Sequence, residues 1–119
     1  RSTKNPNYVL SWHDDLNFGD LDDNKNQLRP HIVWFGEDVP ALDQAIETTK
    51  SADYFAVIGT SLQVYPAAGL IDFVNPETAV FYIDPKPAKI SNLRNPLHII
   101  PEVASQGMKT LKKKLISII

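Results

Sequence analysis

The stretch that decides the fold is Gln27-Leu28-Arg29-Pro30-His31-Ile32-Val33-Trp34-Phe35-Gly36-Glu37. Residues 31–35 are rich in β-branched and aromatic side chains, which predicts a buried strand closed by Gly36. A second unit of the same kind follows, in which the apolar run at 54–58 leads into Gly59-Thr60-Ser61. These two units carry most of what the sequence says about function.

Composition bounds the rest of the interpretation. The chain has 119 residues, of which 43% are hydrophobic, so it can bury one core and reads as one small domain. No apolar run approaches the roughly 18 residues of a membrane span and no signal pattern is present, so we expect a cytoplasmic protein. A formal net charge of −2 gives no general attraction to nucleic acid or to an anionic membrane. The absence of cysteine excludes disulfides, thiolate zinc sites and cysteine nucleophiles.

Hydrophobic periodicity predicts alternating helices and strands after a loop-rich opening. The predicted helices cover about 40–51, 65–74 and 105–118, and the predicted strands cover 54–58, 79–83 and 97–100. In the last helix, Ser105 is the expected N-cap, and Met108, Leu111, Leu115 and Ile118 are expected to face inward. The alternation predicts parallel pairing through right-handed crossovers. The fold class is therefore α/β, half of a doubly wound, Rossmann-like parallel sheet in a three-layer α/β/α arrangement.

No metal site is predicted. Asp20, Asp22 and Asn24 have the spacing of a calcium loop, but Lys25 stands where that loop needs glycine and His31 where it needs glutamate. His13 with its neighbouring aspartates reads as a solvated polar loop, because no second histidine lies at ligand spacing.

Chemistry in a sheet of this kind is expected where loops leave the carboxyl ends of the strands. Gly59 permits close backbone approach, and Thr60 and Ser61 offer hydroxyls and amides near a helix start, which suits a phosphate or a ribose. Asp84 can accept hydrogen bonds from ribose hydroxyls. From these features alone, nucleotide binding and a plain role in turns both stay open. The segment around Ser61 lacks the second glycine of a hydrolase nucleophile elbow, which argues against Ser61 as a nucleophile.

Residues 28–37 and 59–68 closely resemble the two signature stretches of the sirtuins, the Sir2-like NAD-dependent protein-lysine deacylases. The resemblance runs over the whole chain and is to the C-terminal half only, in a zinc-free, bacterial-type form. It implies that residues 1–27 are a loop-rich remnant of the small, zinc-module-like region. Residues 28–119 would be the C-terminal half of the NAD-binding, Rossmann-like domain.

The resemblance implies NAD as the cofactor and assigns residues to it. Gly59, Thr60 and Ser61 match the family motif that contacts the ribose and phosphates of NAD. Asp84, with Pro85 and Lys86, falls where sirtuins usually carry an asparagine that holds the adenosine ribose, and a carboxylate can still accept from ribose hydroxyls. Ala104 matches the residue under the adenine.

The resemblance also implies a cleft for an acyl-lysine protein or peptide. Val33 matches the position whose carbonyl receives the acyl-lysine amide, and Trp34 and Phe35 match the aromatic pair after it. Gly36, Glu37 and Val64 match the two edges between which the peptide is laid as an added strand. The alternative from the residues alone is that 33–35 are simply core residues of a buried strand.

No catalytic residue is assigned in this chain. The sirtuin Gly-Ala-Gly loop, the Asn-Ile-Asp segment and the catalytic histidine have no match in it, and none of its three histidines falls at the catalytic position. The chain, which begins without methionine, is therefore expected to be a fragment and to be inactive alone. In place of the zinc module we expect a mobile segment held only by packing of Trp12, Leu16 and Phe18.

The expected function is thus the C-terminal portion of an NAD-dependent deacylase, with the acyl specificity left open. One alternative is a non-catalytic module that binds NAD or ADP-ribose. Another is a domain that works only when assembled with another chain, either its missing N-terminal half or a second copy. Neither nucleic acid nor a membrane is expected as a partner.

Overall fold

A computed structural model describes residues 1–117 of the chain in two compact units. Unit 1 is Arg1–Asp38, and unit 2 begins at Val39. The division at residue 27 that the family resemblance suggests stays a prediction. No helix among residues 1–117 is long and apolar enough to cross a membrane.

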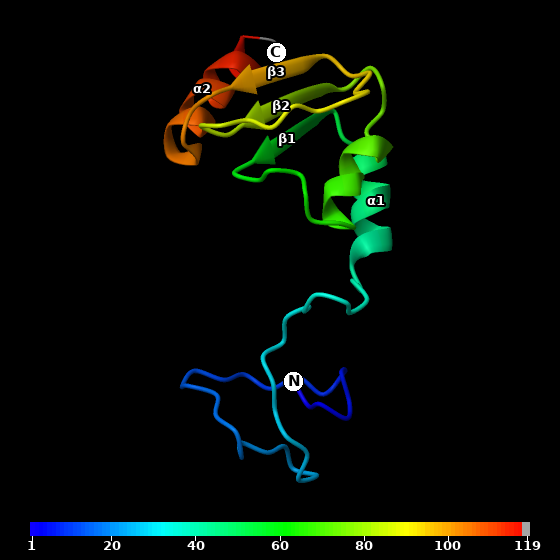
Figure 1. Cartoon of the computed structure of the whole chain (residues 1–119), viewed down its shortest axis with the longest axis vertical. Helices are drawn as coiled ribbons and strands as arrows, with labels where there is room; N and C mark the ends of the chain where they lie inside the picture. The colour runs from blue at the N-terminus through cyan, green and yellow to red at the C-terminus, as the bar shows by residue number, and fades with distance from the viewer. Residues whose placement is uncertain (118–119) are drawn as a thin grey trace. The chain divides into compact units, whose positions relative to one another are not determined.

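Unit 2 is built on a three-stranded parallel sheet (Figure 1). The strands are β1 (Tyr54–Ile58), β2 (Ala79–Ile83) and β3 (Leu97–Ile100), in the order β1-β2-β3. The register places Ile58 beside Ile83 and Ile83 beside Ile100, so all three strands end at the same edge of the sheet. The strands predicted at 54–58, 79–83 and 97–100, their bounds and their parallel pairing are confirmed.

Helices lie on both faces of this sheet. The helices are α1 (Leu42–Lys50), the 3-10 helix η1 (Ala67–Phe73) and α2 (Ala104–Ile116). Helix η1 packs with α1 and covers one face, while α2 packs on β2 and β3 (Figure 1). The α/β class and its layered, doubly wound character are confirmed.

Alternation along β2 produces two cores, one on each face. Val80 and Tyr82 point to the η1 face and pack with Val57, Ile71 and Val74. Phe81 and Ile83 point to the α2 face, where they pack with Ile100 and Leu111. Strand β2 is therefore buried on both sides, and its residues 80–83 are at most 1% exposed. A parallel strand covered on both faces is a continuous apolar run, which is why the sequence identified it.

Two of the helices, η1 and α2, differ in detail from the prediction made from hydrophobic periodicity. The sequence predicts an inward stripe at α-helical spacing for this segment, made of Ala67, Leu70, Ile71 and Val74. The buried residues of η1 are instead Ala68 and Ile71, three apart as a 3-10 helix requires. In α2 the inward stripe is Gly107 and Leu111 with Leu115 partly buried, and Met108 is 44% exposed.

The start of α2 also differs from the prediction. Its N-cap is Val103 rather than Ser105, because the Val103 carbonyl already accepts the N–H groups of Gln106 and Gly107. Ser105 therefore lies inside the first turn. The inward orientation expected of Ile118 concerns a residue outside the described range.

Residues 31–35 do not form the predicted buried strand. Phe35 is 90% exposed and Trp34 is 53% exposed. A strand needs a backbone partner, and no segment among residues 1–117 pairs with this one. The Glu37 N–H donates to the Trp34 carbonyl instead, at 3.1 Å, which closes a turn.

The polar opening in unit 1 is held by hydrogen bonds rather than by the predicted aromatic packing. Phe18 is fully exposed and Trp12 is 44% exposed. The Asp22 carboxylate accepts the N–H groups of Asn24 and Asn26 at 2.9 and 2.8 Å. Hydrogen bonds from Ser2 and Asn26 lower the pKa of Asp22.

Helix α2 approaches the sheet at a glycine. A Cβ added to Gly107 would lie 2.2 Å from the Cγ2 atom of Ile83, which is closer than carbon atoms can pack. The glycine therefore sets how closely α2 lies on β2.

Substitution of Gly107 tests this close approach. We expect Gly107→Ala to lower the free energy of unfolding by about 1–3 kcal/mol, because overpacking must displace α2 or Ile83. Gly69→Ala is the matched control, since its Cβ would meet Tyr65 ring carbons at 3.5 and 3.6 Å, an ordinary contact. Urea unfolding of both variants measures the difference. Equal losses in the two would contradict the close approach.

Candidate functional site

Three loops leave the sheet of unit 2 at the carboxyl edge of the strands, where α/β sheets place their sites. The ladder continues one residue beyond the strands. The Gly59 N–H donates to the Ile83 carbonyl at 2.9 Å, and the Asp84 N–H donates to the Ile100 carbonyl at 3.3 Å. The starts of the first two loops are thereby fixed relative to the strand beside each.

The loop after β1 presents backbone and hydroxyl groups to solvent. Gly59 has a φ of 62°, a left-handed conformation that favours glycine, and the space around its missing Cβ is empty. The Leu62 N–H donates to the Thr60 hydroxyl at 3.2 Å, which closes a tight turn. Thr60 and Ser61 are exposed. This loop can therefore admit a ligand against its backbone.

The loop after β2 presents a carboxylate. Asp84 is half-buried, and its Oδ1 accepts the Lys86 N–H at 2.7 Å, an arrangement that orients the side chain. Pro85 and Lys86 are exposed. Ala104, exposed at the first position of α2, follows the third strand. All seven residues predicted to bind the cofactor thus lie after the carboxyl ends of three adjacent strands.

A tyrosine that the sequence analysis did not select connects two of these loops. The Tyr82 hydroxyl donates to the Thr60 carbonyl at 2.7 Å and accepts the Ala88 N–H at 3.0 Å. Its only sequence signal is a phenol in a strand that is otherwise apolar, since a buried tyrosine hydroxyl needs a partner.

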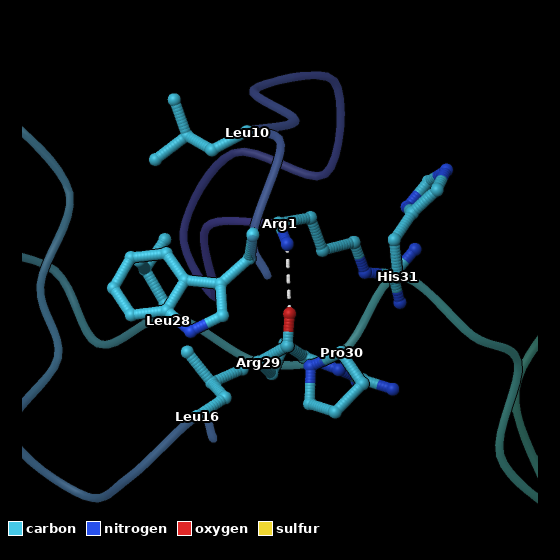
Figure 2. A pocket seen from close by; sticks show the side chains of 8 residues that line it. Arg1, Leu10, Leu16, Leu28, Arg29, Pro30 and His31 are labelled. Atoms are coloured by element: carbon cyan, nitrogen blue, oxygen red, sulfur yellow. Dashed lines mark hydrogen bonds between the residues drawn. The ribbon is translucent and has the colours of Figure 1, made fainter. Parts of the chain in front are cut away.

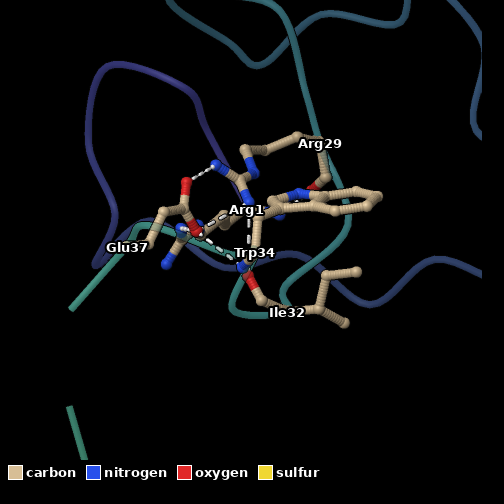
Figure 3. A network of polar contacts seen from close by, with 5 residues as sticks. All are labelled: Arg1, Arg29, Ile32, Trp34 and Glu37. Carbon is tan, nitrogen blue, oxygen red and sulfur yellow. Dashed lines mark hydrogen bonds and ion pairs between the residues drawn. The ribbon is translucent and has the colours of Figure 1, made fainter. Parts of the chain in front are cut away.

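Residues 29–37 of unit 1 form a loop closed by an ion pair (Figure 3). The Arg29 guanidinium contacts both carboxylate oxygens of Glu37, at 2.5 and 3.1 Å. The same carboxylate accepts the Trp34 N–H at 3.0 Å, and Arg29 also donates to the Ile32 carbonyl at 3.3 Å. Glu37 therefore holds both ends of the loop. Glu37 is a residue predicted from the sequence, whereas its pairing with Arg29 has no signal in the sequence.

This network changes the acidity of Glu37. Hydrogen bonds from Arg29 and from the Trp34 N–H lower the pKa of Glu37 from 4.5 to about 2. The Arg29 pKa is raised by the same contact with Glu37. The carboxylate is thus ionised in the folded loop at any pH near neutrality.

The predicted substrate residues are exposed. Val33, Trp34 and Phe35 are 45%, 53% and 90% exposed in unit 1, and Val64 is 55% exposed in unit 2. The alternative interpretation, in which 33–35 are core residues of a buried strand, is wrong for the described structure. Their assignment to a peptide substrate stays a prediction.

Unit 1 also contains a cavity of about 310 Å³ (Figure 2). Its walls are Arg1, Leu10, Trp12, Leu16, Leu28, Arg29, Pro30 and His31. Two backbone hydrogen bonds between Arg1 and Arg29, at 2.7 and 2.9 Å, hold one side of it. None of the predicted site residues lines this cavity. Within residues 1–117, no group of three or more acidic or histidine side chains is placed to hold a metal ion.

The acidity of Glu37 predicts how unit 1 responds to acid. Because the folded pKa of Glu37 lies below its ordinary value of 4.5, its stabilisation is fully present above pH 4.5. That stabilisation is lost as the pH falls from 4.5 toward about 2. We expect Glu37→Gln to be less stable than the wild type at pH 7 and to lose less stability over that window.

Both tryptophans of the chain, Trp12 and Trp34, lie in unit 1, so their fluorescence under denaturant at several pH values reports this stability. Asp22 also contributes in acid, and the difference between variant and wild type isolates Glu37. Asp38→Asn, which removes an exposed carboxylate with no described ion pair, is the control. Parallel pH profiles for Glu37→Gln and wild type would contradict the role of the ion pair.

Comparisons with known proteins identify the family of the chain. The sequence profile of the Sir2 family matches residues 5–66. The NAD-dependent protein deacylase of Helicobacter pylori strain 26695 is 51% identical over 98% of the chain and 50% of that protein. The NAD-dependent protein deacylase of Bacteroides thetaiotaomicron is 42% identical over 98% of the chain and 50% of its own length. The chain thus spans about half the length of the curated relatives it matches.

Solved structures show the same relation. A Sir2 homolog in complex with NAD matches with a TM-score of 0.77 and 29% identity, over 99% of this chain and 47% of that one. Sir2Tm bound to a propionylated peptide matches with a TM-score of 0.64 and 29% identity, over 82% of this chain and 42% of that one. With its profile match over more than half its length and this shared fold, the chain belongs to the Sir2 family.

Proposed function

We propose that this chain is the C-terminal portion of an NAD-dependent protein-lysine deacylase and that it contributes the ribose and adenine side of the NAD site. The observation that carries the proposal is the meeting of the three predicted cofactor loops at one edge of the sheet. Relatives that are 51% and 42% identical are named NAD-dependent protein deacylases, and a structural neighbour is a complex with NAD.

The groups present at this edge suit NAD. The open space at Gly59 admits a ligand against the backbone, and the exposed hydroxyls of Thr60 and Ser61 suit a ribose or phosphate oxygen. The Asp84 carboxylate accepts hydrogen bonds from ribose hydroxyls, with Pro85 and Lys86 completing its turn. Ala104 offers a small apolar surface to the adenine. When bound, NAD would supply an electrophilic ribose carbon, which the acyl oxygen would attack as nicotinamide leaves.

We propose that the loop of residues 29–37 receives the acyl-lysine peptide. The Val33 carbonyl would accept the acyl-lysine amide N–H, and Trp34 and Phe35 would flank it. Gly36 and Glu37 would pair with the peptide backbone as an added strand. The family resemblance assigns Val64, in unit 2, to the same substrate. The exposure of these residues and the Arg29–Glu37 ion pair that orders the loop support this role.

The proposed catalytic base lies outside this chain. The proposal takes none of the three histidines as the base. His31 lies beside the Leu-Arg-Pro motif, and His13 lies in the polar opening. His98 lies in β3, where its ring stacks on Phe81 of β2. We infer that the chain alone is inactive and that the other half of the family polypeptide provides the base. A cytoplasmic location belongs to the same proposal.

A chimera tests the proposed activity. We expect the 119-residue chain alone to show no turnover, and a fusion with the other half of the Helicobacter pylori relative to deacylate an acyl-lysine peptide only when NAD is present. In the fusion, Asp84→Ala should raise the KM for NAD about tenfold or more, because it removes a charged hydrogen-bond acceptor. The KM for the peptide should not change.

Lys89→Ala is the control, since Lys89 is an exposed residue of the same loop that belongs to no proposed contact. A folded, inactive fusion would overturn the proposed activity. An equal effect of Asp84→Ala and Lys89→Ala on the KM for NAD would overturn the assignment of Asp84.

The second candidate is a module that binds NAD or ADP-ribose without catalysis. Its support is that all seven predicted cofactor residues belong to unit 2 of this one chain. Titration of ADP-ribose into the chain, followed at the amides of Gly59, Thr60, Ser61 and Asp84, separates it from a domain that must first assemble. Saturable shifts confined to these amides favour the module, and their absence favours assembly.

We further propose that the other half of the family polypeptide, joined to this chain or separate, covers strand β1. In the described residues β1 pairs only with β2, and α2 packs on β2 and β3. Tyr54 and Ile58 on β1 are 41% and 39% exposed, and a cavity of about 170 Å³ lies along β1 and η1. An unpaired strand edge with apolar side chains is a pairing surface.

A charge placed on this strand tests the partner. Ala56 is exposed at the centre of β1, so we expect Ala56→Asp to leave the chain folded and to abolish its binding to a separately produced other half. Ile116→Asp, on the exposed side of α2, is the control and should bind normally. Sedimentation of the mixtures reads out binding. Self-association of the chain through β1, or normal binding by Ala56→Asp, would contradict the proposal.

A further inference from the structure

Tyr82 is a polar side chain at the centre of an apolar core. Its residue is 0% exposed, and its ring packs in the cluster of Val57, Ile71, Val74 and Val80. A tyrosine hydroxyl has one proton to donate and lone pairs that accept. A buried hydroxyl without hydrogen-bond partners would lower the stability of the fold. The groups to which this hydroxyl is bonded therefore indicate its structural role.

Both partners are backbone groups of the proposed nucleotide loops. The hydroxyl donates to the carbonyl of Thr60, in the loop after β1, at 2.7 Å. It accepts the N–H of Ala88, in the loop after β2, at 3.0 Å. One oxygen atom therefore joins two loops that are 22 and 6 residues away from it in the sequence.

The first bond orients a particular peptide unit. In a trans peptide the carbonyl and the following N–H point in opposite directions. Because the Thr60 carbonyl is turned inward to Tyr82, the N–H of Ser61 is turned away from the core. Among residues 1–117 the Ser61 N–H has no acceptor, and Ser61 is exposed. The inward bond thus leaves an outward donor.

The second bond limits the loop that carries Asp84. The Asp84 N–H donates a hydrogen bond to the Ile100 carbonyl, which holds the start of the loop to the sheet. The Asp84 side chain accepts a hydrogen bond from the Lys86 N–H. The bond from Ala88 to Tyr82 fixes the far end of the same turn. The carboxylate therefore sits on a turn anchored on both sides.

We propose that Tyr82 is a positioning residue for nucleotide binding, whose hydroxyl sets the spacing of the two loops and turns the Ser61 N–H toward the ligand. This inference rests on the proposed NAD site and adds to it a residue that never touches the ligand. Tyr82 acts through the backbone of Thr60 and Ala88.

The test removes one atom. Tyr82→Phe keeps the ring in the core and deletes the hydroxyl. We expect the full chain carrying Tyr82→Phe to bind ADP-ribose about tenfold more weakly than wild type, because the Ser61 peptide unit is no longer held in its binding orientation. We also expect faster amide hydrogen exchange at Ala88, which loses its acceptor, and a changed amide shift at Ser61.

Val80→Ala is the matched control. Val80 lies in the same strand and the same core cluster and is also 0% exposed, but it belongs to neither loop. It lowers stability by leaving a cavity. A merely structural role for Tyr82 predicts that both variants lose ADP-ribose affinity in proportion to their loss of stability. A positioning role predicts that only Tyr82→Phe does.

The outcomes separate this inference from the proposal beneath it. Weaker binding by Tyr82→Phe with normal binding by Val80→Ala supports the inference. Wild-type affinity and unchanged Ala88 exchange in Tyr82→Phe overturn it, and leave the NAD site standing. Failure of the wild-type chain to bind ADP-ribose, both alone and in the fusion with the other half, overturns the proposed NAD site and the inference together.

Discussion

The backbone ladder of the parallel sheet extends one residue past the strands, and the rest of the site depends on this extension. Gly59 and Asp84 are each held to the neighbouring strand by an N–H donated to the last carbonyl of that strand. Loops usually gain freedom as soon as they leave a sheet. Here each of the two loops departs from a fixed point, and the side chains that follow inherit its position. A polar site can therefore be assembled from short, exposed segments without a dedicated core of its own.

The parts of the fold that the sequence predicted well are those whose neighbours lie inside the chain. Strand β2 is covered on both faces by residues of unit 2, so its continuous apolar run has one structural meaning. Residues 31–35 are also rich in β-branched and aromatic side chains but form no strand, because a strand also needs a backbone partner and none is present in the described chain. Composition indicates that a segment can be buried, while pairing decides whether it is.

The candidate site divides in the same way. Gly59, Thr60, Ser61 and Asp84 could be chosen from sequence because each follows a strand, and strand ends are readable. Tyr82 and Arg29 could not, since their roles rest on partners 22 and 8 residues away that only the folded chain brings within reach. The inward stripes of η1 and α2 differ in part from the prediction for a related reason, because Ala68 rather than Ala67 is buried in η1 and Gly107 rather than Met108 is buried in α2. Hydrophobic periodicity predicts that a helix has a buried face. Which residues form that face also depends on the pitch of the helix and on a close approach at glycine.

The close approach of α2 has a mechanical consequence for the proposed adenine contact at Ala104. Gly107 and Ala104 are three residues apart in one helix, so they lie on neighbouring positions of the same rigid cylinder. Any change that moves α2 away from the sheet at Gly107 also moves Ala104. The distance between α2 and the sheet is set by the absence of a side chain at Gly107. The adenine contact proposed for Ala104 and the packing of α2 on the sheet are consequently linked, so that a substitution at Gly107 changes both together.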